Sequence, residues 1–484
     1  MEGLIPTRWI KRLRYCGIER GVSILLAMHP VQHLLGRMGF GLSPNEWEHY
    51  RGQTPDRIVD NLLRQARSPR SLSAPATEYM PADPRMLSQE ERLEIVKKRM
   101  LQTATVNLEW LQRMADPAEP ALLERMCLFW HGHFACDIKG GDLAVSYLNT
   151  LRTHGLGHFG DLAKAIAREP AMIRYLNNQQ NRKEQPNENF ARELLELFTI
   201  GRGHYTEQDI KEAARAFTGW SSTLRGTYVF RRQWHDYGSK TFMGRRGRFD
   251  GDDIIDIILE RKETAGFLAS KLYRYFVHPA GHAQREAELA AVFYESNYHI
   301  GRTVEHMLRA EWFYAPENWR AQIKSPVVLM AGLMRTLKVT TGEPLPLIYV
   351  QRMLGQVLFR PPNVAGWPGG RQWIDNATLM NRLNLAQAII QGRSLPGRAK
   401  DDLKAKTRED RPKGLRVDVD LKPLLRIGQA PNSRQMQQQL TDYILPGMPI
   451  PTSLLTRYAR GKTSGEETAF TAIRLLSMPE YQLC

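Results

Sequence analysis

The chain has 484 residues, of which 42% are hydrophobic and 24% are charged, and its net charge at pH 7 is +16. A chain of this length can bury a large core, and its composition is that of an ordinary globular protein. The longest apolar runs, residues 22–28 and 326–334, are far shorter than the roughly 20 residues that a membrane-spanning helix needs, so we expect no membrane span.

The first thirty residues form a basic segment. Arg8, Lys11, Arg12 and Arg14 precede the apolar run 22–28, an order that faintly resembles a signal peptide. Charged residues adjoin that run and no small-residue cleavage site follows it, so we interpret the segment as a basic amphipathic helix. The four cysteines of the chain form no CxxC pair. The sequence therefore leaves the compartment open between an exported or periplasmic location and the cytoplasm.

Helical periodicity dominates the rest of the chain. Apolar residues recur at three- and four-residue spacing in 56–67, 89–114, 120–130, 162–176, 189–198, 208–217, 253–259, 266–276, 286–294, 303–309, 435–444 and 467–476. Thr206, with Asp209 three residues later, predicts a capped helix start. Strand patterns are confined to 227–230 and 240–243, which we expect to form one small hairpin. The sequence thus predicts a mainly α-helical fold, a single large helical domain with long functional loops.

Composition divides the chain into four regions. Residues 1–30 are the basic segment, and residues 31–395 are the expected helical core. Residues 396–424 read as a charged linker, because 397–413 is highly charged and almost free of large apolar residues. Residues 425–484 are expected to form a C-terminal helical extension packed on the core.

Two histidines lie in a strongly apolar stretch, Trp130-His131-Gly132-His133-Phe134. If the helix continues through this stretch, the two side chains point about 200° apart and cannot bind one ion. If the helix ends at Gly132, both imidazoles can converge on a metal. The alternative is that one histidine caps the helix and the other packs in the core.

A second ionisable cluster lies in the helix expected at 189–198. Glu188, Arg192 and Glu196 share one helical face at four-residue spacing, and Glu193 falls between the polar and apolar faces. One interpretation is an exposed ladder of ion pairs. The other is a functional site in which Glu193 is the acid and Arg192 keeps a neighbouring carboxylate ionised.

A third cluster, His235-Asp236, lies in a polar loop that contains glycine. Loops carried by a rigid scaffold are common positions for catalytic residues. His235 suits a third metal ligand or a general base oriented by a carboxylate, and a surface histidine is the alternative.

Residues 361–370 form a loop rich in proline and glycine that contains Trp367 and is followed by Trp373. Two tryptophans in a rigid loop suit stacking on a sugar or another planar ligand. They also suit a loop that plugs the core, which we favour slightly.

Several common enzyme motifs are absent from the sequence. It contains no phosphate-binding loop, no dinucleotide-binding glycine fingerprint, no Gly-x-Ser-x-Gly elbow and no His-Glu-x-x-His helix. This removes the usual nucleotide-dependent, serine-hydrolase and metalloprotease explanations.

The chain resembles the bacterial domain-of-unknown-function family 1800 (DUF1800) over nearly its whole length from about His33. The matching segments are 33–41 (HLLGRMGFG), 129–134, 169–176 (EPAMIRYL), 186–201, 205–220 (ending in AFTGW), 235–244, 324–326, 361–370 and 475–483. The resemblance implies no settled activity. It implies frequent export, and a possible partner of the DUF1501 type, a family that resembles sulfatases. Gly132 and Asn177 differ from the residues common at these positions in the family.

From these clusters we expect a metal-dependent enzyme, hydrolytic or oxidative, that acts on an anionic or glycan-like substrate. The expected site converges on one pocket, with His131, His133 and Glu188 as ligands of a divalent zinc, manganese or iron ion, and with Glu193, His235, Arg192 and Asp236 as catalytic residues. The alternative is a non-catalytic binding or scaffold protein that holds an acidic partner or a polyanion. Histidines packed as neutral core groups would favour that alternative.

The positive charge predicts an anionic polymer or an acidic protein as partner. The sequence contains no groove-reading motif, so we expect no sequence-specific nucleic-acid binding. Lys240 and the cluster Arg245, Arg246 and Arg248 follow the His235 loop, where they could guide an anion. Together with Trp367 and Trp373, Lys240 and Arg245 are the expected substrate-binding residues.

Overall fold

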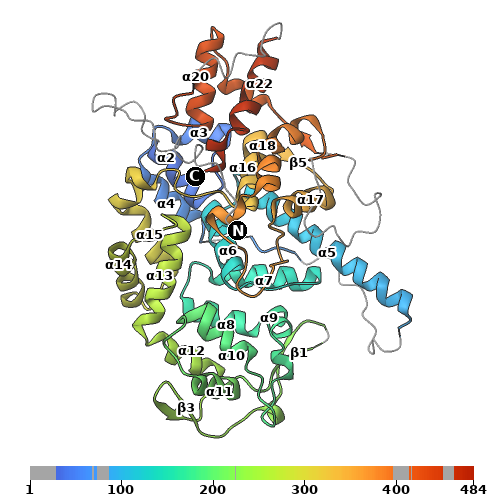
Figure 1. Ribbon diagram of the computed structural model, residues 1–484, viewed down its shortest axis with the longest axis vertical. Coiled ribbons are helices and arrows are strands. Elements are labelled where there is room, and N and C mark those ends of the chain that lie inside the picture. Colours follow the sequence, from blue (N-terminus) through green and yellow to red (C-terminus); the bar gives the residue numbers. More distant parts are fainter. Residues whose placement is uncertain are drawn as a thin grey trace, which may run out of the picture.

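The computed structural model describes residues 29–67, 70–73, 87–223, 225–395, 414–415, 417–450 and 463–484. The basic segment expected at the N-terminus and most of the expected linker lie outside these residues. The mainly α-helical fold is confirmed, with small two-stranded sheets as the β-structure of the described residues (Figure 1). In the described part of the chain, no helix has the length and apolar character needed to cross a membrane.

The α-helices are α2 (Pro30–Met38), α3 (Pro44–Tyr50), α4 (Pro55–Gln65), α5 (Gln89–Ala115), α6 (Ala121–His133), α7 (Gly141–His154), α8 (Phe159–Arg168), α9 (Pro170–Tyr175), α10 (Asn189–Glu193), α11 (Glu207–Ala216), α12 (Gly251–Leu259), α13 (Lys262–Phe276), α14 (Ala283–Glu295), α15 (Ile300–Arg309), α16 (Pro326–Leu337), α17 (Pro344–Leu354), α18 (Asn376–Gln391), α19 (Lys422–Ile427), α20 (Ser433–Ile444) and α22 (Ser464–Leu476). A π-helix, η3 (Leu194–Thr199), continues α10, and short 3-10 turns are η2 (Asn178–Gln180), η4 (Arg232–Trp234), η5 (Glu311–Tyr314), η6 (Pro316–Asn318), η7 (Gly370–Trp373) and η10 (Pro479–Gln482). The strands are β1 (Trp220–Ser222), β2 (Tyr228–Phe230), β3 (Lys240–Phe242), β4 (Arg245–Gly247), β5 (Val339–Thr340) and β6 (Asp418–Val419).

Local sequence explains where several helices begin. The predicted start of α11 is confirmed, because Thr206 accepts from the backbone N–H of Asp209 and the Asp209 carboxylate accepts from that of Thr206. The helix expected over 162–176 is divided into α8 and α9. Glu169 between them is extended, with ψ of 124°, and Pro170 opens α9. The residue before a proline is disfavoured in the helical region, which is the reason for the break.

The expected single hairpin is wrong, because the two strand segments belong to different sheets. β2 pairs with β1, with Ser222 opposite Tyr228, and β3 pairs with β4. Met243 and Gly244, both at positive φ, form the tight turn between β3 and β4, as a two-residue hairpin turn requires. The loop that carries His235 therefore connects two hairpins.

The core is centred on α5, α6 and α7, with α16 and α17 packed against α5. Trp110 of α5 and Trp130 of α6 are fully buried, and nearly every residue of α6 is buried. A helix that is apolar on all sides must be enclosed by other elements. The histidines of α6 therefore lie within the core.

The C-terminal elements return to α2 at the N-terminal side of the core (Figure 1). The Tyr443 hydroxyl donates to the Leu42 carbonyl at 2.7 Å, and the Gln32 amide donates to the Tyr443 carbonyl at 3.0 Å. A β-bridge joins Ile323 to Leu483. Beta strand β6 lies within the expected linker and pairs with β5.

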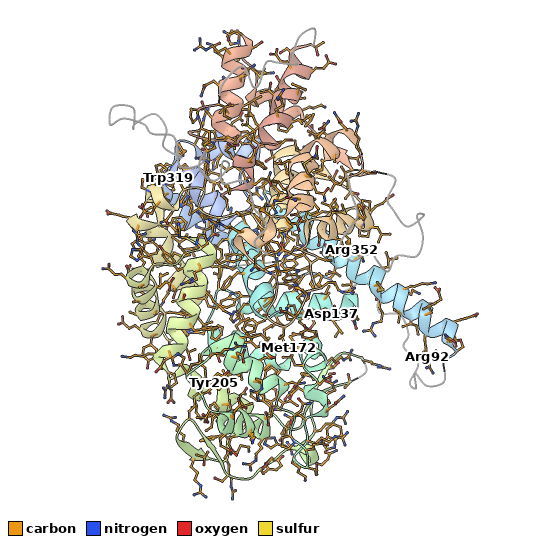
Figure 2. The ribbon with its side chains drawn as sticks, viewed as in Figure 1. Arg92, Asp137, Met172, Tyr205, Trp319 and Arg352 are labelled. Carbon is orange, nitrogen blue, oxygen red and sulfur yellow. The ribbon has the colours of Figure 1, made fainter. Side chains whose placement is uncertain are left out.

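The N-terminal half of α5 projects from the body as an arm, with Arg92 near its tip (Figure 2). Leu93, Val96, Met100 and Leu101 on this arm have about half of their surface exposed. The same helix is buried from Thr103 onward, apart from single positions. One helix thus serves both as core and as a protruding apolar surface.

Candidate functional site

Helix α6 continues through His133, so His131 and His133 lie on different sides of it. The structure thus has the first of the two arrangements that the sequence left open. Both rings are buried, with 1% and 7% of their surface exposed. Their partners belong to different parts of the chain.

His131 is a core residue. Its Nε2 accepts a hydrogen bond from the backbone N–H of Phe359 at 3.2 Å, and the ring of Trp367 stacks on it with a centroid distance of 5.1 Å. Trp110 makes an edge contact on another side. Burial lowers the pKa of His131 to about 3, so the ring is neutral at physiological pH.

His133 belongs to a polar group at the end of η3. Its Nε2 lies 2.9 Å from the carbonyl oxygen of Phe198, and its Nδ1 lies 3.2 Å from Nζ of Lys271. Because a carbonyl only accepts, Nε2 carries the proton and Nδ1 accepts from Lys271. Lys271 also donates to the Leu197 carbonyl at 2.8 Å. Burial, then the charge of Lys271, lowers the pKa of His133 well below its usual value, and burial lowers that of Lys271 to about 8.

Glu188 and Arg192 form the exposed ladder that was one interpretation of the sequence. Arg192 donates to Glu188 at 3.0 Å and to Glu207 at 2.8 Å, with Arg192 and Glu188 each about one-third exposed. Glu193 differs from its neighbours. It is half-buried, and burial followed by the charge of Glu196 raises its pKa. A raised pKa is the direction expected of a proton donor.

His235 is held by backbone contacts. Its Nδ1 lies 2.8 Å from the Thr218 carbonyl, and it is 5% exposed. Asp236 beside it binds Arg215 at 2.7 Å. Burial opposes ionisation of Asp236, but the hydrogen bonds from Arg215 and Gly238 outweigh it and lower the pKa.

The expected substrate-binding residues have structural partners. Lys240 is 1% exposed and donates to the carbonyls of Asp236 and Gly238, which is the reason why its ammonium group does not face an outside ligand. Arg245 is exposed and pairs with Glu260 at 2.8 Å.

The proline-rich loop packs on the core, as the favoured interpretation predicts. Trp373 is 6% exposed, and Trp367 covers His131. Gly366 faces the carbonyl oxygen of Gly132 so closely that a Cβ atom there would lie 2.4 Å from it. Only glycine permits this approach at a positive φ of 83°.

Several of the expected site residues have separate partners: His131 and His133 lie on different sides of α6, and Arg192 pairs with Glu188. No three histidine, cysteine, aspartate or glutamate side chains of the described residues form a group that could hold a metal ion. One reason is geometric, because His131 and His133 are two positions apart on an intact helix and their imidazoles point to different sides. Among the acids, Glu188 binds Arg192 and Asp236 binds Arg215. Lys271 was not predicted, because its partners are one backbone carbonyl and one ring nitrogen, both far away in the sequence.

The sequence analysis also missed an exposed arginine–tryptophan surface, made of Arg182, Arg231, Arg232, Trp234 and Tyr237. The guanidinium of Arg182 lies 4.0 Å from the centroid of the Trp234 ring, and that of Arg231 lies 4.7 Å from it. Tyr237 is 59% exposed nearby, in contact with His235. The signal available was the basic and aromatic run Arg231-Arg232-Gln233-Trp234.

Stacking leaves the arginines of this surface able to bind an anion. None of its three arginines forms an ion pair with a carboxylate within the described residues. A guanidinium stacked on an aromatic ring can still direct its in-plane N–H groups at a carboxylate, sulfate or phosphate. Arg231 donates from its Nε to Oγ of Ser221 at 3.4 Å, so its terminal N–H groups are the ones that would bind a ligand. The surface is carried by β2 and η4 on one side and by the segment after η2 on the other, at the end of the molecule that holds the two hairpins (Figure 1).

A comparison with protein families gives one match. The model of a family described as "Protein of unknown function (DUF1800)" matches residues 33–483. No curated protein and no solved structure matches the chain.

Proposed function

We propose that this chain, which belongs to the DUF1800 family of proteins of unknown function, is a binding protein that holds an anionic polymer on its arginine–tryptophan surface. The observation that carries the proposal is the stacking of Arg182 and Arg231 on Trp234. Both guanidinium groups are held in place before a ligand arrives, which reduces the entropy lost on binding.

The wider properties of the chain agree with this function. The net charge of +16 favours encounter with anions. Tyr237 and Phe230, exposed by 59% and 37%, add apolar area beside the arginines, which suits a polymer of anionic sugars. The packing of His131 and His133 as neutral core groups also favours the binding alternative over the enzyme.

Retention on a heparin column at rising salt tests the proposal. The double variant Arg182→Gln/Arg231→Gln should elute at clearly lower salt than the wild type. The matched control is Arg57→Gln/Arg64→Gln, which removes the same charge from the exposed face of α4. The slope of log affinity against log salt should fall by about two in the first variant, since each lost contact removes about one released counterion.

Equal retention of the two variants would show that only net charge matters and would overturn the proposal. Competition by polyglutamate as effective as competition by heparin would instead identify an acidic protein as the partner. The fold of each variant is checked by its circular dichroism spectrum and its Tm.

A metal-dependent enzyme is the second candidate function. The observation that favours it is Glu193, whose raised pKa and half-buried position suit general acid chemistry. A zinc, manganese or iron ion would require ligands to gather differently from the described arrangement. Elemental analysis of the purified protein after reconstitution with each metal, beside a Glu193→Gln variant, tests this candidate. A protein that retains no metal after reconstitution would contradict it.

A further inference from the structure

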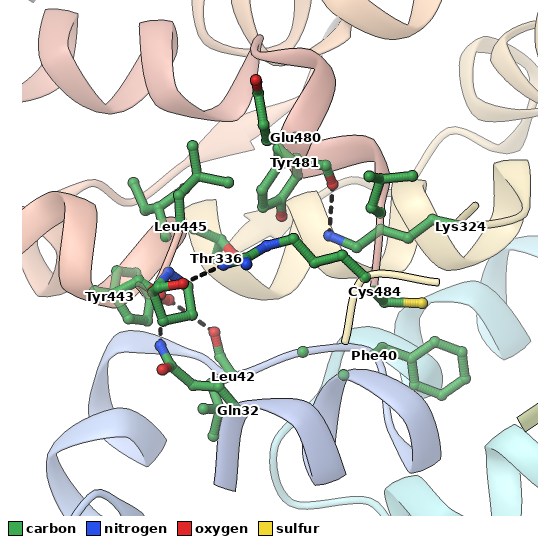
Figure 3. Close-up of a pocket in the computed structure, with 16 residues that line it drawn as sticks. Gln32, Phe40, Leu42, Lys324, Thr336, Tyr443, Leu445, Glu480, Tyr481 and Cys484 are labelled. Atoms are coloured by element: carbon green, nitrogen blue, oxygen red, sulfur yellow. Dashed lines mark hydrogen bonds between the residues drawn. The ribbon is translucent and has the colours of Figure 1, made fainter. Parts of the chain in front are cut away.

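A cavity of about 90 Å³ opens where the C-terminal elements return to α2 (Figure 3). Phe40, Tyr443 and Tyr481 supply aromatic walls, and Arg320 and Lys324 supply positive charge. A volume of this size holds several waters or a molecule of a few heavy atoms. Helices α2 and α20, which supply lining residues, lie in the half of the molecule opposite the hairpins that carry the arginine–tryptophan surface (Figure 1).

The two cations at this cavity bind backbone carbonyls in place of carboxylates. Lys324 donates to the Tyr481 carbonyl at 2.8 Å, and its Nζ lies 3.7 Å from the centroid of the Tyr481 ring. Arg320 donates to the carbonyl of Pro446. Burial lowers the pKa of Lys324 to about 8 and also lowers that of Arg320. Both cations are thus poorly compensated.

Three more guanidinium groups lie in the core behind the cavity. Arg37, Arg125 and Arg382 are 1%, 5% and 0% exposed, and each has at least one buried N–H group with no hydrogen-bond partner among the described residues. Arg382 donates to the Lys324 carbonyl at 2.5 Å, and Arg125 lies 5.8 Å from the centroid of the Phe40 ring. These contacts place Arg382 and Arg125 beside residues that line the cavity, and Arg37 follows the lining residue Gly36 in the sequence.

The negative charge at the cavity does not balance the positive charge. Burial lowers the pKa of Arg37, Lys324 and Arg320, and interaction with Cys484 or Glu480 offsets this only in part. Glu480 is the one acidic side chain among the described residues that line the cavity, against the two cationic side chains of Arg320 and Lys324. An uncompensated buried charge is costly, and a bound anion would remove that cost.

We propose that this cavity binds a small organic anion, with its carboxylate or phosphate group between Arg320 and Lys324 and its apolar part against Tyr443 and Tyr481. A pocket with apolar walls and a few converging charged groups is the usual form of a small-molecule site. This site does not depend on the proposed binding of an anionic polymer. Its ligand is small enough to enter the cavity, whereas a polymer binds the surface.

Thermal unfolding of the full-length protein, with sodium phosphate, sodium butyrate or sodium chloride added at equal ionic strength, tests the proposal. Phosphate or butyrate should raise Tm by a few degrees in a saturable manner, because a ligand that binds only the folded state stabilises it. Chloride should not. The ranking of phosphate and butyrate identifies the preferred anionic group.

The variant Lys324→Met should weaken binding of the preferred anion at least about ten-fold, since a charge-assisted hydrogen bond is lost. Without added anion, its Tm should equal or exceed that of the wild type, because a poorly compensated charge is removed. The control is Arg335→Met. Arg335 is more deeply buried than Lys324 and pairs with Glu46, so this variant should lose Tm in every buffer and keep the anion-dependent rise.

A second variant, Glu480→Gln, tests the same site if the Lys324→Met protein does not fold. It removes the carboxylate that lines the cavity and should tighten anion binding several-fold. The absence of a saturable rise with either anion, an unchanged rise in Lys324→Met or an unchanged affinity in Glu480→Gln would each overturn the proposal.

Discussion

The Nε2 atom of His133 lies 2.9 Å from the carbonyl oxygen of Phe198. Phe198 is near the end of the π-helix η3, whose last carbonyls have no partner within the helix. His133 binds one of these carbonyls, and Lys271 binds that of Leu197 at 2.8 Å. The histidine that the sequence suggested as a metal ligand thus closes the end of the helix that carries Glu193.

Replacement of His133 by alanine should lower the free energy of unfolding by about 2–4 kcal/mol. The change leaves the Phe198 carbonyl without its partner, removes one of the two partners of Lys271 and opens a cavity between aromatic rings. Urea denaturation followed by circular dichroism measures the loss. His204→Ala, at an exposed position, is the control, and a loss no larger than in this control would contradict the structural role of His133.

The stability of the protein should fall as the pH is lowered below 6.5. Burial lowers the pKa of His33 and His131 to about 3, and lowers that of His133 as well. Between about pH 6.5 and 3 the unfolded chain binds protons at His33 and His131 and the folded chain does not, so each of these two histidines costs about 1.4 kcal/mol of stability per pH unit. His133 shifts the stability in the same direction.

Urea denaturation at pH 7.5, 6.5 and 5.5 checks this prediction before most carboxylates titrate. In the variant His131→Gln, the loss of unfolding free energy between pH 6.5 and 5.5 should be smaller than in the wild type, because one of these three buried histidines no longer contributes to it. A free energy of unfolding that stays constant from pH 6.5 to 5.5 would argue against neutral buried histidines.

Glu124→Ala should be among the most destabilising single changes, with a loss of about 3–5 kcal/mol. Glu124 is fully buried, forms an ion pair with the buried Arg152 and accepts from Nε1 of Trp110 at 2.9 Å. Its removal leaves the buried guanidinium of Arg152, among the described residues, with only the more distant carboxylate of Glu119, at 3.9 Å. The control is Glu94→Ala in the exposed pair with Lys97, which should leave the urea midpoint unchanged; similar midpoints for both variants would refute the prediction.

The two halves of α5 should respond differently to the same change. Leu111 is fully buried, so Leu111→Ala should cost about 2–5 kcal/mol, whereas Leu93 is 57% exposed on the arm. Leu93→Ala should change the free energy of unfolding by less than about 0.5 kcal/mol. A large loss of stability in Leu93→Ala would mean that the arm is covered by other parts of the chain.

Helical periodicity was sufficient to predict the fold class, and the capping pattern at Thr206 located the start of α11. These features are local, since a helix bonds within itself. The partner strands of β2 and β3 were not predictable in this way, because the alternating pattern of a strand does not say which other strand it pairs with. β2 pairs with β1, and β3 pairs with β4. Pro170 alone indicates the break between α8 and α9, because the residue before a proline is disfavoured in a helix, although one continuous helix was expected there.

The candidate site was harder to predict than the fold, because its contacts are made to the backbone. His131 binds the N–H of Phe359, and His133 binds the carbonyl of Phe198, and neither partner atom depends on a side-chain pattern. The stacking of Arg182 on Trp234 joins segments that are distant in the sequence. In this chain, a histidine in an apolar stretch therefore indicates a buried side chain more reliably than it indicates a catalytic or metal-binding role.

The hydrogen bond from Phe359 to His131 spans 228 positions of the chain. At a synthesis rate of 5–20 residues per second, the ribosome needs about 10–45 s to make the intervening residues. Trp367, which stacks on His131, is made later still. For that interval the aromatic side of α6 is exposed on the nascent chain, so this helix is the segment for which we expect chaperone protection during translation to matter most.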